Sequence, residues 1–209
     1  NLVRYKAVTS DANAGLEQYL QMLQSIDPRE LNKAEQFAYW VNFYNAATVR
    51  VILDEYPTRS ILRTGKKFFA IGPWDDKVAT VAQQKITLND IEHRILRPIW
   101  NDHRIHFIVN CASIGCPNLS KQALTASNAE ALLNQAAKDY LNHPRGFELK
   151  GDKLYLSTIF KWYAKDFGQT KLEMLETLGH YLTKPKQQTI SDSSPKIKYR
   201  YDWSLNEQK

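Results

Sequence analysis

The two cysteines of this chain are its most reactive side chains, and four residues separate them in the segment NCASIGCP at positions 110–117. A cysteine attacks as its thiolate, and a nearby histidine or a helix N-terminus lowers the pKa of the thiol. Cys116 stands directly before Pro117, a residue that favours the first position of a helix, and His106 lies shortly before Cys111. This spacing makes Cys116 a candidate nucleophile with His106 as its base.

Three kinds of site are compatible with the cysteine pair. In the first, Cys116 attacks an ester or amide carbonyl, and His106 or His93 accepts its proton. Glu92 or Asn110 would then orient the imidazole, and the reaction would be acyl hydrolysis or acyl transfer. In the second, the two cysteines form a disulfide that stabilises the fold by roughly 2 kcal/mol. In the third, the cysteines and the same histidines bind zinc, although the histidines lack a recognisable ligand spacing.

The elements around this segment determine which side chains can meet. The alternation in residues 104–111 predicts a strand, with His106 and Asn110 on the same face. The chain then turns, and Pro117 suits the first position of a helix. Cys116 would be the N-cap of that helix, where the dipole and the free amide groups favour a thiolate or an oxyanion.

A long helix is predicted over residues 31–55, because apolar residues recur at helical spacing and the pattern ends before Pro57. Asparagine is a poor helix former that needs hydrogen bonds when it is buried, yet Asn42 and Asn45 share one face of this helix, with Glu35 two turns before Asn42. Either the amides attach the helix to a neighbouring loop or they contact a ligand. All three residues are candidate binding residues.

A second helix is predicted from the capping box that Thr87 and Asp90 form. His93 and Arg97 lie one turn apart on it, whereas Glu92 is expected to point elsewhere. A single histidine in such a position is more often structural than catalytic. Arg97 is a further candidate binding residue, and His93 is the alternative base.

The rest of the chain predicts a hairpin over residues 147–156, a helix between Ser157 and Gly168, a polar loop over 184–195 and a last strand over 197–203. Helices before and after a few strands are typical of an α+β fold. We therefore expect a single α+β domain over residues 1–209, with several helices packed around a small, mainly antiparallel sheet.

Composition narrows the possible functions. The net charge is +6, but 28 basic residues are spread among 22 acidic ones, which is not the clustered pattern of a nucleic-acid interface. No apolar stretch is long enough to span a bilayer. The chain begins at Asn1 without methionine, so we expect a processed or truncated product. Two cysteines are compatible with one disulfide in an exported protein, and we expect a periplasmic or otherwise exported location. We expect a small-molecule or peptide ligand, and no motif indicates a cofactor.

Five ordered motifs resemble the family called domain of unknown function 547. They are EQFAYWVNFYNA at 35–46, LNDIEHRILR at 88–97, HFIVNCASIGCP at 106–117, STIFKWY at 157–163 followed by Asp166-Phe167, and YDWSLN at 201–206. The resemblance implies no established activity. Bacterial members resemble exported proteins, and plant members join the domain to a coiled coil, which would suit an interaction role. The positions that match the family pattern are Glu35, Asn42, Asn45, Glu92, His93, Arg97, His106, Asn110, Cys111, Cys116 and Asp166.

Overall fold

The computed structural model describes residues 2–65, 72–192 and 195–208. In chain order its elements are η1 (Tyr5–Ala7), α1 (Ser10–Ser25), η2 (Pro28–Glu30), α2 (Lys33–Asp54), η3 (Ile61–Arg63), β1 (Lys77–Val81), β2 (Gln84–Thr87), η4 (Asp90–Leu96), α3 (Arg97–Trp100), α4 (Ile105–Ile108), α5 (Ala129–Asn142), β3 (Phe147–Lys150), β4 (Lys153–Ser157), α6 (Ile159–Trp162), α7 (Ala164–Phe167), α8 (Lys171–Gly179), α9 (Lys184–Asp192) and β5 (Lys196–Arg200). This mixture of helices and small sheets confirms the predicted α+β fold.

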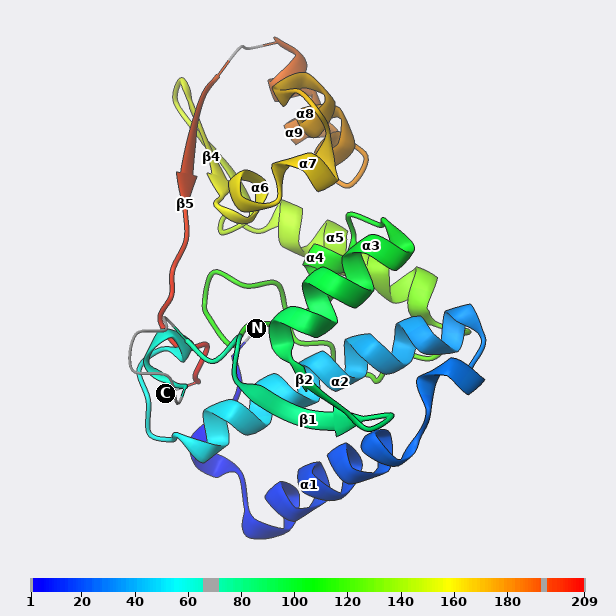
Figure 1. Ribbon diagram of the computed structural model, residues 1–209. Coiled ribbons are helices and arrows are strands. Elements are labelled where there is room, and N and C mark those ends of the chain that lie inside the picture. The colour runs from blue at the N-terminus through cyan, green and yellow to red at the C-terminus, as the bar shows by residue number, and fades with distance from the viewer. Residues whose placement is uncertain (1, 66–71, 193–194, 209) are drawn as a thin grey trace.

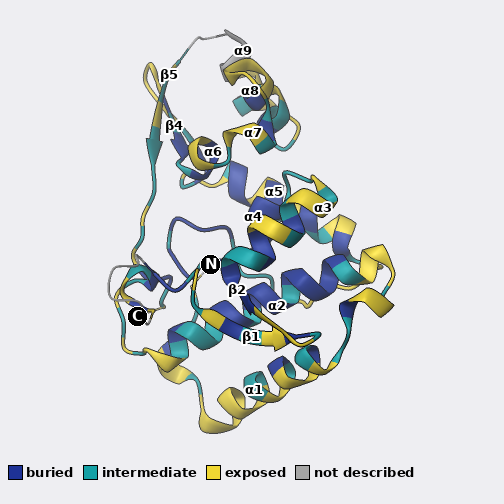
Figure 2. Ribbon diagram, in the orientation of Figure 1, coloured by how far each residue is buried: buried dark blue, intermediate teal, exposed yellow. Residues whose placement is uncertain are grey.

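Helix α2 runs through the lower half of the molecule, between α1 and the β1–β2 hairpin on one side and the helices η4, α4 and α5 on the other (Figure 1). It begins at a capping box: the Asn32 side chain accepts from the N–H of Glu35, and the Glu35 carboxylate accepts from the N–H of Asn32. Figure 2 shows α2 as largely buried, whereas α1 exposes its outer face. The predicted long helix is confirmed, and Glu35, a candidate binding residue, serves to start it.

The upper half contains the second sheet, in which β4 lies between β3 and β5 (Figure 1). Strands β3 and β4 form the predicted antiparallel hairpin, and its turn uses Gly151 at a φ of 59°. Strand β5 joins β4 in parallel after the crossover through α6 to α9. The strands therefore form two small, mostly antiparallel sheets instead of one. Residues 184–192, predicted as a loop, form α9, which Lys186 attaches to the backbone carbonyls of Leu141 and Phe147.

The structure corrects two predictions about the cysteine segment. Residues 104–111 are not a strand: α4 is a short helix, and the chain becomes extended only at Val109. Every side chain of α4 is buried, so its apolar alternation does not mark a buried and an exposed face. No helix begins at Pro117 either, because α5 begins at Ala129, and Cys116 is therefore not an N-cap residue.

The C-terminal segment, and not a helix, packs against the loop that contains the two cysteines. The backbone N–H groups of Ile114 and Gly115 donate to the carbonyls of Ser204 and Asp202, both at 2.8 Å. Ser113 also forms an isolated antiparallel bridge with Leu205. The cysteine segment is consequently held as an irregular loop against the end of the chain, whose last residues also lie beside the N-terminal segment (Figure 1).

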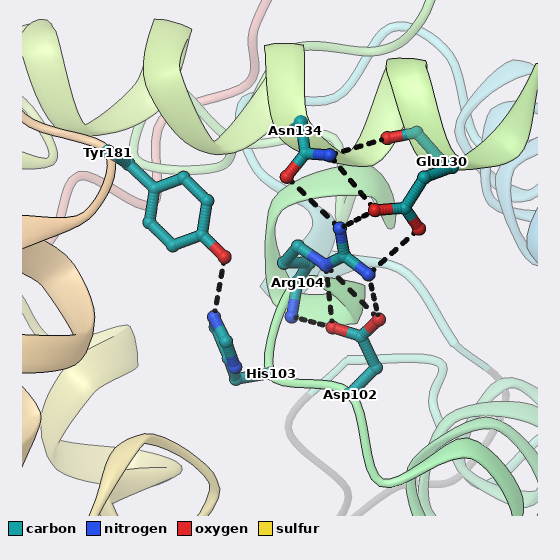
Figure 3. Close-up of polar contacts among 6 residues, drawn as sticks. All are labelled: Asp102, His103, Arg104, Glu130, Asn134 and Tyr181. Carbon is teal, nitrogen blue, oxygen red and sulfur yellow. Dashed lines mark hydrogen bonds and ion pairs between the residues drawn. The ribbon is translucent and has the colours of Figure 1, made fainter.

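A partly buried arginine fixes α4 against α5 (Figure 3). The Arg104 guanidinium donates to Asp102 at 2.7 Å, to Glu130 on α5 at 2.5 Å and to Asn134 at 3.0 Å. These bonds raise the pKa of Arg104, so its charge is permanent. Next to it, His103 Nε2 lies 2.9 Å from the Tyr181 hydroxyl. These contacts therefore set the orientation of α4, and with it the direction of the His106 side chain, and none of them involves residues 110–117.

Across residues 2–65, 72–192 and 195–208, no helix combines the length and the apolar character that crossing a membrane requires.

Candidate functional site

A cavity of about 250 Å3 lies where helices from both halves of the molecule meet the cysteine loop and the C-terminal segment. Most of its lining is aromatic. The lining residues are Tyr44, Trp74, Asn89, Glu92, His93, His106, Val109, Cys111, Cys116, Pro117, Ile159, Trp162, Tyr163, Tyr201 and Trp203. The cavity therefore brings together four of the five predicted catalytic side chains: Cys116, His106, His93 and Glu92.

The π-helical segment η4 carries two of these residues. It starts with the predicted capping box, in which Thr87 and Asp90 exchange hydrogen bonds of 2.9 Å. At its end the Arg97 N–H donates to the carbonyl of Glu92, an i to i+5 bond that widens the helical turn. Glu92, expected to point away from His93, consequently lines the same cavity as His93. Glu92 is buried at 5% exposure, while His93 is exposed.

His106 enters the cavity from α4 and is paired with a carboxylate. Its Nε2 lies 2.6 Å from Asp166 Oδ2, and its ring stacks on Tyr163 with 4.1 Å between ring centroids. Only 1% of the His106 side chain is exposed. Since the Asp166 carboxylate can only accept, His106 donates to it from Nε2, and the other ring nitrogen is Nδ1. That atom lies 3.9 Å from Glu92 Oε1.

Arg97 supports this pair from behind the cavity wall. Its Nε and one Nη donate to the two oxygens of Asp166 at 2.6 and 2.9 Å, and its other Nη lies 3.1 Å from His93 Nδ1. Burial would raise the pKa of Asp166, but hydrogen bonds from His106 and Arg97 lower it well below its ordinary value. Arg97 was predicted as a binding residue, yet its guanidinium is engaged with Asp166 and His93 and is not part of the lining.

Two tyrosines hold the Glu92 carboxylate. Tyr44 and Tyr163 both form side-chain hydrogen bonds with Glu92. Desolvation by burial, followed by the Glu92 charge, raises the pKa of each phenol far above its usual range, so both remain protonated donors. Glu92 is therefore held by neutral donors.

Cys111 and Cys116 are joined by a disulfide with 6.1 Å between their Cα atoms, and it forms part of the cavity wall. The Cys111 N–H donates to Cys116 Sγ at 2.9 Å, and Cys111 Sγ lies 3.0 Å from the Tyr201 hydroxyl. A bonded sulfur is not a thiolate, so the intact disulfide holds no nucleophile at Cys116.

The asparagines bind the backbone instead of facing the cavity. Asn45 donates to the Ile108 carbonyl at 3.0 Å and accepts from the Asn110 N–H at 2.8 Å. Asn42 makes the equivalent pair of 2.9 Å bonds with Leu124. The Asn110 side chain donates to the carbonyl of Pro117 at 2.6 Å and also accepts from a backbone N–H of the cysteine loop. These contacts agree with the interpretation that the amides attach helix and loop.

Several residues of the cavity were not predicted as site residues. Asp166 was one of the positions matching the family pattern, but its sequence distance from His106 gave no sign of their pairing. Trp162 and Tyr163 come from the motif at 157–163, and Tyr201 and Trp203 come from the motif at 201–206. The repeated aromatic residues in these motifs were the available signal.

Within the part of the chain that the structure describes, no group of three or more His, Cys, Asp or Glu side chains is arranged to hold a metal ion. The two sulfurs that a zinc site would need are bonded to each other. The arrangement can therefore do two things chemically: accept hydrogen bonds at Glu92, and hold apolar groups against aromatic rings.

No curated protein and no solved structure matches this chain. Residues 28–141 match the family described as "Protein of unknown function, DUF547". The matched stretch contains α2, η4, α4 and both cysteines, whereas Asp166, Tyr163 and Tyr201 lie beyond it. Because this match covers more than half of the 209 residues, the chain belongs to the DUF547 family.

Proposed function

We propose that this protein is a binding domain that takes a small organic ligand, or one side chain of a peptide, into the cavity beside the Cys111–Cys116 disulfide. The observation that carries the proposal is the convergence of distant chain segments on one mostly aromatic cavity with a few buried polar groups. Such a lining is typical of ligand sites. The cavity, at about 250 Å3, is smaller than the roughly 300–1,000 Å3 of sites for drug-sized molecules, which favours a small ligand.

The disulfide supports binding over cysteine chemistry. Cys116 is 2% exposed and bonded, and the loop around it is hydrogen-bonded to the C-terminal segment. A rigid wall suits recognition, because a preorganised site loses less conformational entropy on binding. A disulfide also persists best in an oxidising compartment, which supports our expectation that the protein is exported.

Nuclear magnetic resonance of the 15N-labelled protein tests the proposal with three single-ring probes: 2-phenylethylamine, 2-phenylethanol and benzoate. We expect at least one probe to shift the indole N–H signals of Trp162 and Trp203 and the backbone signals around His106. Trp162→Ala should lower the affinity for that probe about tenfold, because it removes an aromatic ring from the cavity wall. Trp162 is 46% exposed, so its truncation should have little effect on folding. Trp100→Ala is the matched control, because Trp100 packs on Phe37 outside the cavity. The proposal is wrong if no probe shifts these signals or if the shifts map to another surface.

A second function, thiol-dependent acyl hydrolysis or transfer, is favoured by one observation: the Asp166–His106 pair and both sulfurs border the same cavity. It requires a dithiol reductant, which converts the disulfide into two thiols and is itself oxidised. His106 Nδ1 would then take the proton of Cys116, the thiolate would form a thioester with the acyl carbon, and the leaving group would depart with that proton. Water would hydrolyse the thioester.

This second function has a separate test. Protein that has been reduced with dithiothreitol and desalted is incubated with p-nitrophenyl acetate, and the acetylated peptide is identified by mass spectrometry. Acetylation of Cys116 that persists in Cys111→Ala and is lost in Cys116→Ala would support the enzyme. If both variants acetylate equally, or if the reduced protein releases nitrophenol no faster than the oxidised protein, the thiol mechanism is refuted.

A further inference from the structure

Two polar atoms, His106 Nδ1 and Glu92 Oε1, face each other in the wall of the cavity without a hydrogen bond between them. His106 donates from Nε2 to Asp166, and its Nδ1 faces Glu92. The distance from Nδ1 to Glu92 Oε1 is 3.9 Å, which is too long for a hydrogen bond. Both side chains are almost fully buried, at 1% and 7% exposure. A ligand with an N–H donor could form a hydrogen bond with the Glu92 carboxylate from the cavity.

The charges around the cavity are also incomplete. Arg97 makes two charged hydrogen bonds with Asp166, so these two charges compensate each other. Glu92 is held by the neutral hydroxyls of Tyr44 and Tyr163, which donate hydrogen bonds but contribute no positive charge. Among the described residues, no cationic side chain is hydrogen-bonded to Glu92, because His106 Nδ1 lies 3.9 Å from its Oε1. A buried charge is costly unless a cation is paired with it.

The aromatic wall is suited to such a cation and to its apolar stem. Tyr201 and Trp203 lie with 4.6 Å between ring centroids, and Trp162 lies 4.9 and 5.4 Å from them. The faces of such rings attract ammonium groups, and their area accommodates a short hydrocarbon.

We propose that the cavity binds the primary ammonium group of a small organic amine, with an N–H group donating to Glu92 Oε1 beside His106 and its apolar stem against the tryptophan and tyrosine rings. The proposal rests on the proposed binding function and specifies the ligand class of the same cavity. It excludes a carboxylate or phosphate ligand at this position, because Glu92 would repel an anion.

The test compares two of the single-ring probes, which differ in one group. 2-Phenylethylamine is a cation at pH 7, and 2-phenylethanol is its neutral counterpart of similar shape. Affinities are measured on the wild-type protein by titration in the same nuclear magnetic resonance experiment. A charged hydrogen bond in a buried site corresponds to about a tenfold or greater preference for the amine. Equal affinities, or tighter binding of the alcohol, would overturn the amine proposal while leaving the binding function intact.

Variants identify the group that makes the preference. Glu92→Gln removes the charge and keeps the shape, so the ratio of the two affinities should fall to about one. The matched control is Glu176→Gln on the exposed face of α8, which removes the same charge from the protein and should leave the ratio unchanged. A ratio that falls equally in both variants would show that net charge, not Glu92, selects the amine and would refute the proposal. If only benzoate reached the cavity, the amine proposal alone would be refuted, whereas failure of all three probes would refute the binding function itself.

Discussion

Replacing Asn45 with alanine tests whether the buried amides of α2 hold the cysteine segment in place. Asn45 is 8% exposed, and its side chain satisfies the Ile108 carbonyl and the Asn110 N–H at the point where α4 ends and the chain becomes extended. Both partner residues are 2% exposed. Asn45→Ala therefore leaves two backbone groups without a partner where water has little access.

The structure gives the expected size of the effect. An unsatisfied buried donor or acceptor costs about 1–3 kcal/mol, so the two groups together should lower the free energy of unfolding by about 2–6 kcal/mol. Asn42 makes the same pair of bonds with Leu124, but its side chain is partly exposed, so water can replace the amide. Asn42→Ala should cost only about 1 kcal/mol.

Urea unfolding followed by far-ultraviolet circular dichroism measures both variants in the oxidised protein. The expected order is a large loss for Asn45→Ala and a small loss for Asn42→Ala, with unchanged slopes. If Asn45→Ala costs no more than Asn42→Ala, the attachment of the cysteine segment to α2 does not depend on this amide. A loss of probe affinity without a loss of stability would instead support the alternative that Asn45 contacts a ligand.

Three further outcomes follow from other contacts. The folded-state pKa of Asp166 lies below its unfolded value of 3.8, so its pairing stabilises the fold fully above about pH 4, and this stabilisation is lost as the pH falls further. In Asp166→Asn, the urea midpoint should therefore fall less between pH 5 and pH 3 than it does in the wild-type protein. Replacing Cys111 and Cys116 by alanine opens a loop with a sequence separation of 5 and should lower the free energy of unfolding by about 2 kcal/mol, and an unchanged urea midpoint would contradict this estimate. Gly168→Ala places a Cβ 2.7 Å from a neighbouring side chain at a φ of 154° and should cost about 2 kcal/mol or more, whereas Gly15→Ala in the open interior of α1 should gain about 0.5–1 kcal/mol in the same assay.

Sequence patterns correctly predicted the elements that depend on interactions between residues close together in the chain. The apolar stripe of α2, the capping box of Thr87 and Asp90, and the hairpin around Gly151 each formed as expected. In each case a short-range interaction determines the structure: helical spacing, a side chain bonded to a backbone amide, or a glycine that accepts positive φ.

The errors arose where long-range contacts decide. An apolar element buried on every side has no exposed face, so α4 and a buried strand give the same pattern. Pro117 suits a helix start, but the neighbouring amide groups of the cysteine loop bind the C-terminal segment instead. The partner of His106 is Asp166, at a sequence separation of 60, and no spacing rule reaches that far.

The disulfide joins residues of the cysteine loop that are close in sequence, whereas its noncovalent contacts join the loop to residues far along the chain. The disulfide joins residues only 5 apart in sequence, so it fixes the shape of the loop but not its place in the molecule. Its place depends on contacts such as that between Cys111 Sγ and the Tyr201 hydroxyl, which span 90 residues. Reduction should therefore loosen the loop locally, whereas loss of the C-terminal segment would remove two aromatic walls together with the backbone partners of Ile114 and Gly115. The cavity is a property of the tertiary fold as a whole, and the cysteine motif supplies only one of its walls.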